Sequence, residues 1–172
     1  MKAAIVGGGV IGGGWTSRFL LNGWDVSVFD PDPQTERKMQ NMLSNARRSL
    51  PSLYDFKLPD EGKLNFCDNL EEAVKNVEWI QESVPERLEI KQGVYREIQK
   101  YCNKNTILAS STSGFKPSEL NEGATKPEQI LVCHPFNPVY LLPLVEVVPS
   151  NKTDPLIVKE CSKLLNQIGM KP

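Results

Sequence analysis

Short apolar runs alternate along the chain with longer stretches whose apolar residues recur every three or four positions. The short runs predict buried β-strands over residues 2–6, 25–29, 64–67, 77–83, 106–109, 130–133 and 144–148. The longer stretches predict helices over residues 15–21, 34–50, 70–76, 88–101 and 155–168. Residues 51–62 contain two prolines and predict a loop or a short, broken helix.

The alternation of strands and helices is typical of a doubly wound α/β fold with a mainly parallel, Rossmann-like sheet. In such sheets ligands bind at the carboxyl ends of the strands. The residues that fall there and carry useful chemistry are Gly7, Asp30, Ser83, Ser113 and His134. We therefore expect one domain over residues 1–172 with its site along this edge.

A glycine-rich turn follows the first predicted strand directly. Gly7, Gly9 and Gly12 have the G-x-G-x-x-G spacing, with Val10 and Ile11 between the last two. In dinucleotide-binding turns the first glycine permits a tight turn, the second admits a pyrophosphate, and the third allows close packing of helix on strand. The N–H groups at the start of the next helix would face the phosphates. A glycine turn without a ligand is the alternative.

Asp30 ends the second strand, eighteen residues after Gly12. A carboxylate in this position accepts hydrogen bonds from the adenosine ribose of a dinucleotide. It would repel a 2′-phosphate, and residues 31–33 contain no arginine that could bind one. The sequence therefore predicts NAD rather than NADP as the cofactor.

Composition narrows the class of protein further. The net charge is −1, from 20 basic and 21 acidic residues, which gives no support for binding to nucleic acid or to an anionic membrane. No apolar run approaches the roughly 20 residues that span a bilayer. The chain starts with a strand rather than a signal peptide, so we expect a cytoplasmic protein. The cysteines form no C-x-x-C pair, which favours reduced, mostly buried thiols and no metal site: Cys67, Cys102, Cys133 and Cys161.

His134 is the only histidine in the chain. It opens a segment with two prolines, 134–138, just after a predicted strand, and Glu146 follows twelve residues later on the next strand. A neutral imidazole can remove the proton of an alcohol, and a carboxylate beside it fixes the tautomer and stabilises the imidazolium. A histidine that only caps a turn is the alternative.

Four segments together resemble the 3-hydroxyacyl-CoA dehydrogenase family: the glycine turn and residues 111–113, 134–138 and 144–147. The resemblance extends along essentially the whole chain and corresponds to that family's N-terminal NAD domain. The motif H-x-F-N-P with a glutamate twelve residues beyond the histidine is its most specific element. It implies that His134 is the catalytic base, Glu146 its partner, and Ser113 a hydrogen-bonding group for the substrate hydroxyl, near the nicotinamide.

The resemblance also implies three further cofactor residues. Glu86 and Lys91 match positions that contact the nicotinamide side of NAD, and Asn137 would help to shape the site. A solvated helix start is the alternative interpretation of Glu86 and Lys91.

The region after the second strand departs from the CoA-using members of the family, which carry a lysine-rich helical hairpin there. This chain has only Lys38, Lys57 and Lys63 in that region, and prolines interrupt it. This departure favours a small free 3-hydroxy acid as the substrate, and the resemblance of residues 134–147 implies that this acid is L-carnitine. A 3-hydroxyacyl-CoA, another 3-hydroxy acid, or dinucleotide binding without turnover are the alternatives.

The family's helical C-terminal domain is absent from the chain, which we expect to be a fragment of an enzyme that is a homodimer at full length. Carnitine carries a trimethylammonium group, which aromatic faces can hold. The aromatic residues beside Ser113 and His134 are Phe115, Phe136 and Tyr140. Core packing is the alternative for Phe115 and Phe136.

Overall fold

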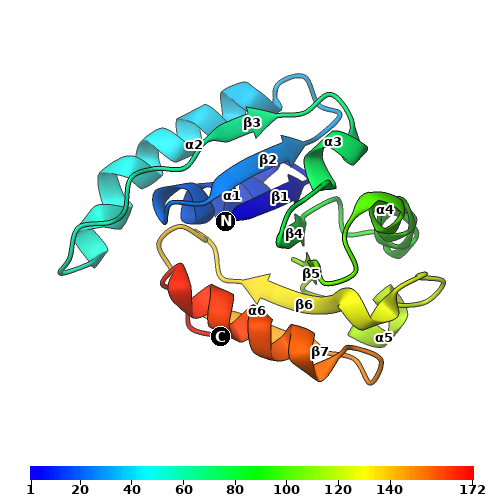
Figure 1. Cartoon of the computed structure of the whole chain (residues 1–172). Helices are drawn as coiled ribbons and strands as arrows, with labels where there is room; N and C mark the ends of the chain where they lie inside the picture. The colour runs from blue at the N-terminus through cyan, green and yellow to red at the C-terminus, as the bar shows by residue number, and fades with distance from the viewer.

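All seven predicted strands form and join one sheet in the computed structural model, which describes residues 1–172 (Figure 1). They are β1 (Lys2–Val6), β2 (Asp25–Phe29), β3 (Leu64–Phe66), β4 (Trp79–Glu82), β5 (Ile107–Ser110), β6 (Ile130–Pro135) and β7 (Val145–Pro149). The order across the sheet is β3-β2-β1-β4-β5-β6-β7. Strands β1 to β6 are parallel, and β7 runs antiparallel to β6. This order confirms the doubly wound, Rossmann-like fold.

The helices follow the predicted pattern with some differences. They are α1 (Val10–Leu21), α2 (Thr35–Ser49), α3 (Leu70–Val74), α4 (Leu88–Tyr101), α5 (Pro117–Leu120) and α6 (Pro155–Gln167). Two short 3₁₀ helices are η1 (Leu50–Leu53) and η2 (Pro127–Gln129). The sequence pattern missed α5 and η2, each of which is too short to show a helical period. Residues 54–63, between η1 and β3, contain no helix or strand.

Helix α1 begins at Val10, five residues before the predicted start. Glycines are poor helix formers, so the run 12–14 did not indicate a helix. Tertiary packing explains why they are helical. A Cβ atom on Gly13 would lie 2.9 Å from the sulfur of Met42 in α2, and one on Gly14 would lie 2.8 Å from Val139 in the β6–β7 connection. The small residues therefore allow both neighbours to approach α1 closely.

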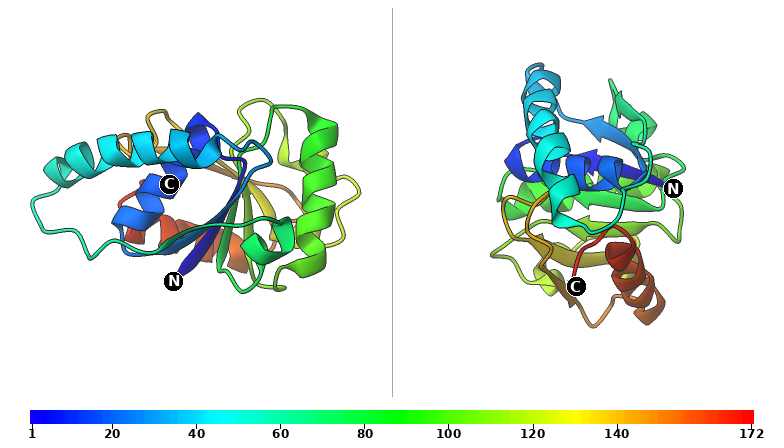
Figure 2. Two further views of the ribbon diagram at one scale, coloured as in Figure 1. Left: turned by 90° about the horizontal axis from the view of Figure 1, so that it is seen from above. Right: turned by 90° about the vertical axis from the view of Figure 1, so that its left-hand side faces the viewer.

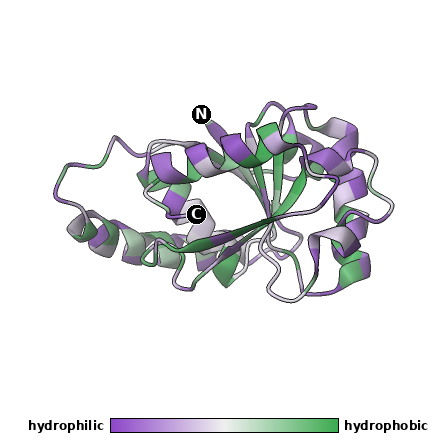
Figure 3. Ribbon diagram, turned by 90° about the horizontal axis from the view of Figure 1, so that it is seen from below, coloured by the Kyte–Doolittle hydropathy of each residue, from purple (hydrophilic) through white to green (hydrophobic).

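Alternate residues of β1 enter two separate cores on the two faces of the sheet. Ala3 and Ile5 pack with residues of α1, α2 and α6, whereas Ala4 and Val6 pack with residues of α3 and α4. Figure 2 shows these two helical layers on either side of the sheet. The strands are mainly apolar and the outer helix faces polar (Figure 3), as expected for a sheet buried on both faces.

The carboxyl edge of the parallel strands brings together the residues predicted to form a site. Gly7 follows β1, Asp30 follows β2, Ser83 follows β4, Ser113 lies shortly after β5, and His134 is near the end of β6. The last residues approach the sheet as well, since Lys171 forms a parallel bridge with Leu144. No helix of the structure combines the length and the apolar character that crossing a bilayer requires.

Candidate cofactor and catalytic site

The glycine turn between β1 and α1 leaves space for a ligand at one position. Gly7 has φ +99°, and a Cβ atom there would lie 2.5 Å from the carbonyl oxygen of Ser83. A Cβ on Gly12 would collide with the carbonyl of Gly7, whereas one on Gly9 would meet no atom within 4 Å. Gly9 is the N-cap of α1 and no side chain caps this helix. The open space and the free N–H groups fit a pyrophosphate.

Asp30 lies beside this turn and holds it. One carboxylate oxygen accepts a hydrogen bond from the N–H of Gly8 (2.5 Å), and the other accepts one from the N–H of Asp32 (2.7 Å). Each oxygen of an ionised carboxylate has a second lone pair, so Asp30 can still accept from ribose hydroxyls. The side chain of Lys38, the nearest following lysine, is paired with Asp32 at 2.6 Å.

A cleft of about 510 Å³ connects Asp30 with the glycine turn. Its other walls are mostly apolar and come from residues after β2 and β4 and from α3 and α4: Phe29, Pro31, Leu70, Val84, Pro85, Ile90 and Val94. An apolar slot beside the carboxylate that is predicted to bind a ribose suits an adenine ring. The residues present therefore fit the adenosine half of NAD.

Glu86 links the segment after β4 to the segment after β5. Its Oε1 atom accepts hydrogen bonds from the Thr112 hydroxyl and from the N–H groups of Ser113 (3.1 Å) and Gly114 (3.2 Å), while Oε2 lies 3.2 Å from the Lys91 ammonium. Burial raises the pKa of Glu86, but these donors and the ammonium outweigh that effect and keep the pKa below its ordinary value. Glu86 therefore fixes the backbone of Ser113 while its side chain stays 45% exposed.

His134 and Glu146 are brought together by the antiparallel pairing of β6 with β7, in which they are direct partners. The distance from His134 Nδ1 to Glu146 Oε2 is 2.8 Å. An ionised carboxylate can only accept, so we assign the proton to Nδ1, which leaves the lone pair of Nε2 available to a substrate. The predicted pair is therefore present as a contact.

Ser113 shares a cleft of about 230 Å³ with His134 and Glu146. Ser113 also lines a second, similar cleft together with Ile11, Glu86 and Lys91. It thus stands between the predicted substrate side and the predicted nicotinamide side of the site. Asn137 is exposed in the turn after β6 and lines neither cleft.

The three aromatic candidates differ in their surroundings. Phe136 is 38% exposed, and its ring centroid lies 5.6 Å from that of His134. Phe115 and Tyr140 are partly buried and pack against the two cores of the sheet. The interpretation of Phe136 as a core residue is therefore wrong, whereas Phe115 does pack against the core.

Two polar residues at this edge were not predicted from the sequence as parts of the site. Glu82 is fully buried at the end of β4, and the hydroxyl of Thr112 donates to Glu86. Ser83, which the sequence does place at this edge, forms a hydrogen bond with Ser111 through their hydroxyls at 2.8 Å. A charged residue that ends an apolar strand, as Glu82 does, is the one signal that could have indicated this cluster.

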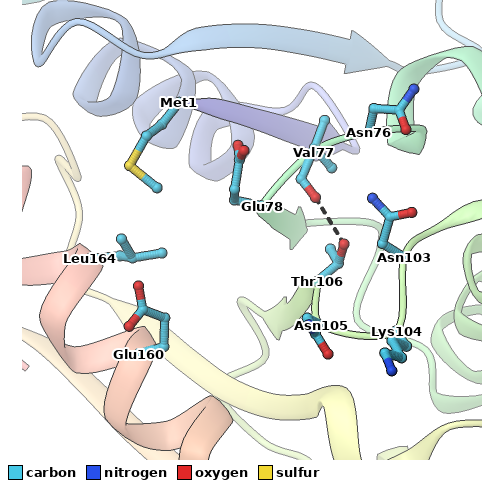
Figure 4. A pocket seen from close by; sticks show the side chains of 10 residues that line it. All are labelled: Met1, Asn76, Val77, Glu78, Asn103, Lys104, Asn105, Thr106, Glu160 and Leu164. Atoms are coloured by element: carbon cyan, nitrogen blue, oxygen red, sulfur yellow. Dashed lines mark hydrogen bonds between the residues drawn. The ribbon is translucent and has the colours of Figure 1, made fainter.

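A cavity of about 630 Å³ lies at the opposite, amino-terminal edge of the sheet, around the starts of β1, β4 and β5 (Figure 4). Its polar lining includes Glu78, Glu160 and Lys104, and the Thr106 hydroxyl donates to the Val77 carbonyl at 2.8 Å. It has no glycine turn and no free helix N-terminus. Ligands of open α/β sheets bind at the other edge, so we do not place the site here.

No cluster of three or more histidine, cysteine, aspartate or glutamate side chains could hold a metal ion. All four cysteines are free and buried. Burial raises the pKa of the Cys133 thiol well above its ordinary value, with its neighbour Cys161 at 3.4 Å as a further cause.

The order of the strands, the open position at Gly9 and the carboxylate at the end of β2 define a dinucleotide-binding domain of the Rossmann class. Residues 2–172 match the family of the 3-hydroxyacyl-CoA dehydrogenase NAD-binding domain. The chain belongs to this family, and its cofactor is NAD.

Similar proteins agree with this assignment. The chain is 61% identical over 170 residues to an L-carnitine dehydrogenase/betainyl-CoA thioesterase of Ruegeria pomeroyi, covering 99% of this chain and 35% of that protein. It is 50% identical over 172 residues to an L-carnitine dehydrogenase of Mesorhizobium japonicum, covering 99% of this chain and 47% of that one. The chain thus spans from about a third to about half of the length of these relatives.

Solved structures show the same fold. A 5-formyl-3-hydroxy-2-methylpyridine 4-carboxylic acid 5-dehydrogenase, an NAD⁺-dependent dismutase, superposes with a TM-score of 0.91 at 32% identity, over 99% of this chain and 56% of that one. The 3-hydroxybutyryl-CoA dehydrogenase of Escherichia coli superposes with a TM-score of 0.86 at 23% identity, over all of this chain and 37% of that one.

Proposed function

We propose that this chain is the NAD-binding part of an enzyme that oxidises the 3-hydroxyl group of a small free 3-hydroxy acid, L-carnitine, to 3-dehydrocarnitine. The observation that carries the proposal is the 2.8 Å contact between His134 and Glu146 in the cleft that also contains Ser113. The choice of carnitine is supported by relatives at 61% and 50% identity that are named L-carnitine dehydrogenases.

In this proposal His134 acts as the general base. Nε2 takes the proton of the substrate hydroxyl, and Glu146 stabilises the imidazolium that forms. The hydroxyl of Ser113 donates a hydrogen bond to the substrate oxygen while the C–O bond becomes C=O. Bound NAD supplies the acceptor for the hydride that leaves the same carbon, so proton and hydride are both accounted for.

Glu86 and Lys91 belong to the nicotinamide side of the site. They line the cleft that begins at Ile11 of the glycine turn and ends at Ser113. A nicotinamide in this cleft would lie next to the substrate cleft, which hydride transfer requires. Asn137 lies in the exposed turn after His134 and would border the same region.

The positive end of carnitine has no N–H to donate, so aromatic faces or carboxylates must hold it. Phe136 is the aromatic candidate in this chain, because it is exposed and adjacent to His134. The substrate cleft of about 230 Å³ has room for a small acid. Lys38 is already paired with Asp32, and residues 54–63 form no helix that could meet CoA phosphates.

A 3-hydroxyacyl-CoA remains the second candidate substrate, because the family itself is described by that activity. The deciding experiment is an NADH-formation assay on an extended chain that has the full length of the relatives, of which this chain covers 35% and 47%. L-carnitine, 3-hydroxybutyrate and 3-hydroxybutyryl-CoA are compared at equal concentrations. We expect the highest kcat/KM with carnitine; a higher value with the CoA ester would replace our proposal with the second candidate.

The same proposal includes a homodimer for the extended enzyme and a location in the cytoplasm. The predicted dimer is tested by light scattering on the extended chain, where a mass of one protomer would contradict it. The location is tested by cell fractionation against a known cytoplasmic marker enzyme.

A further inference from the structure

Glu82 is a buried carboxylate with a complete set of partners. It is 0% exposed at the carboxyl end of β4. Oε1 accepts from the Lys91 ammonium (2.7 Å) and the N–H of Val84 (2.8 Å), and Oε2 accepts from the hydroxyls of Tyr95 (2.5 Å) and Ser110 (2.7 Å). Four donors suit an ionised carboxylate, and they join β4, β5 and α4 at one point.

Lys91 directs its ammonium inward. Its side chain is 1% exposed, and Nζ contacts Glu82 Oε1 at 2.7 Å, Glu86 Oε2 at 3.2 Å and the carbonyl of Val84 at 3.3 Å. An ammonium has three N–H donors, so all three are engaged within the protein. Lys91 therefore has no donor left for a cofactor, and of the two charged residues that line the cleft only Glu86 has an exposed side chain.

The cluster of Glu82, Glu86 and Lys91 contains two carboxylates and one ammonium, so its net charge is −1. It borders the cleft lined by Ile11, Ser83 and Ser113, on the side of the glycine turn away from Asp30. If the pyrophosphate lies at the start of α1, the nicotinamide falls in this cleft. That ring is positively charged in NAD⁺ and neutral in NADH.

We propose that Glu82 sets the preference of the domain for the oxidised over the reduced cofactor. Without it, Lys91 and Glu86 would neutralise one another; with it, the nicotinamide cleft keeps a net negative charge that attracts only the cationic ring. Glu82 itself is buried, so solvent screens its charge less than it would screen an exposed carboxylate. Glu82 thus acts through the cluster rather than by contact with the cofactor. This inference rests on the proposed function, because it needs the nicotinamide in this cleft.

The test compares the dissociation constants of NAD⁺ and NADH for the 172-residue chain and for the variant Glu82→Gln. NADH binding is followed by its fluorescence, and NAD⁺ binding by displacement of NADH. Glutamine keeps the shape and removes the charge. We expect the ratio Kd(NAD⁺)/Kd(NADH) to rise roughly tenfold, as for a unit charge about 10 Å away at an effective dielectric constant of about 20.

Glu89→Gln is the matched control, since it removes the same charge from an exposed side chain on the same helix. It should leave the ratio within about twofold, because solvent screens that position. If Glu82→Gln raises both dissociation constants by the same factor, Glu82 only supports the structure and the inference is wrong.

A second variant keeps the test valid if Glu82→Gln fails to fold. Glu86→Gln removes the same charge at the exposed end of the cluster and should raise the ratio in the same direction; an unchanged ratio would also overturn the inference. The ratio is measured without substrate, so a failure to oxidise carnitine leaves it standing. Failure of the unmodified chain to bind NADH would instead count against both proposals.

Discussion

Replacing Asp30 tests the link between one carboxylate and the choice of cofactor. A 2′-phosphate would replace the hydroxyl that Asp30 is expected to bind, so its charge would come within about 4 Å of the carboxylate. At an effective dielectric constant of about 20 this repulsion is about 4 kcal/mol per unit charge, or roughly a thousandfold in affinity. NAD itself would lose a hydrogen bond to a charged group, worth about 1.5–3 kcal/mol.

The variant Asp30→Ala should therefore bind NAD roughly ten- to a hundredfold more weakly and bind NADP no more weakly than before. Calorimetric titration of both cofactors measures this. Asp30 also accepts from the N–H groups of Gly8 and Asp32, so Asp30→Asn, which keeps one acceptor oxygen, separates charge from loop support.

Asp25→Ala is the matched control for Asp30→Ala. Asp25 lies at the other end of the same strand, where it accepts from the N–H of Lys63 at 2.8 Å. This variant should leave both cofactor affinities unchanged. Equal affinities of the unmodified chain for NAD and NADP, or a parallel loss of both on replacement of Asp30, would refute the reasoning.

Four further predictions follow from the site and the core. In the extended enzyme His134→Ala should reduce kcat by about 10²–10⁴-fold while NADH fluorescence titrations remain nearly unchanged. Glu146→Gln should reduce kcat less than His134→Ala does, because the imidazole keeps its place while the imidazolium that forms loses the charge that stabilises it; an unchanged kcat would argue against the pair. Phe136→Ala should raise KM for carnitine more than KM for an uncharged analogue, and equal increases would mean that the ring only packs the turn. The buried Cys133, whose pKa is raised, should resist iodoacetamide at pH 8 in the folded chain and react once guanidinium unfolds it, as peptide mass spectrometry would show.

The local pattern of residues was enough to predict the strands and the glycine turn. The ranges 2–6 and 25–29 agree with β1 and β2 to the residue, because residues 3–6 are an apolar run buried on both faces and β2 alternates buried valines with partly buried residues. The turn at Gly7 and the carboxylate of Asp30 could also be predicted, because the dinucleotide-binding pattern requires a glycine and an acidic residue at defined spacings along the chain. Because Gly7 and Asp30 each follow a strand in the sequence, the sequence also shows that they lie at the carboxyl ends of these strands.

Contacts between distant segments could not be read in this way. Helix α1 starts at Val10 and includes glycines, because Met42 and Val139 pack closely against those glycines. Both residues lie far from α1 in the sequence. The twelve-residue spacing of His134 and Glu146 allowed a contact but did not require one. The register of β6 on β7 decided it, and register depends on how both strands bury their inward faces.

The cluster of Glu82, Glu86 and Lys91 separates most clearly what the sequence predicts from what the fold decides. From the sequence, Glu86 and Lys91 were a possible cofactor pair or a solvated helix start, and Glu82 was one residue of a strand. The fold buries Glu82 and Lys91 against each other and leaves Glu86 as the exposed end. The sequence by itself determined which chemical groups are available and the edge of the sheet at which they lie. Only the tertiary structure decided which charges neutralise one another, because burial and pairing depend on side chains from three separate elements packing at one point.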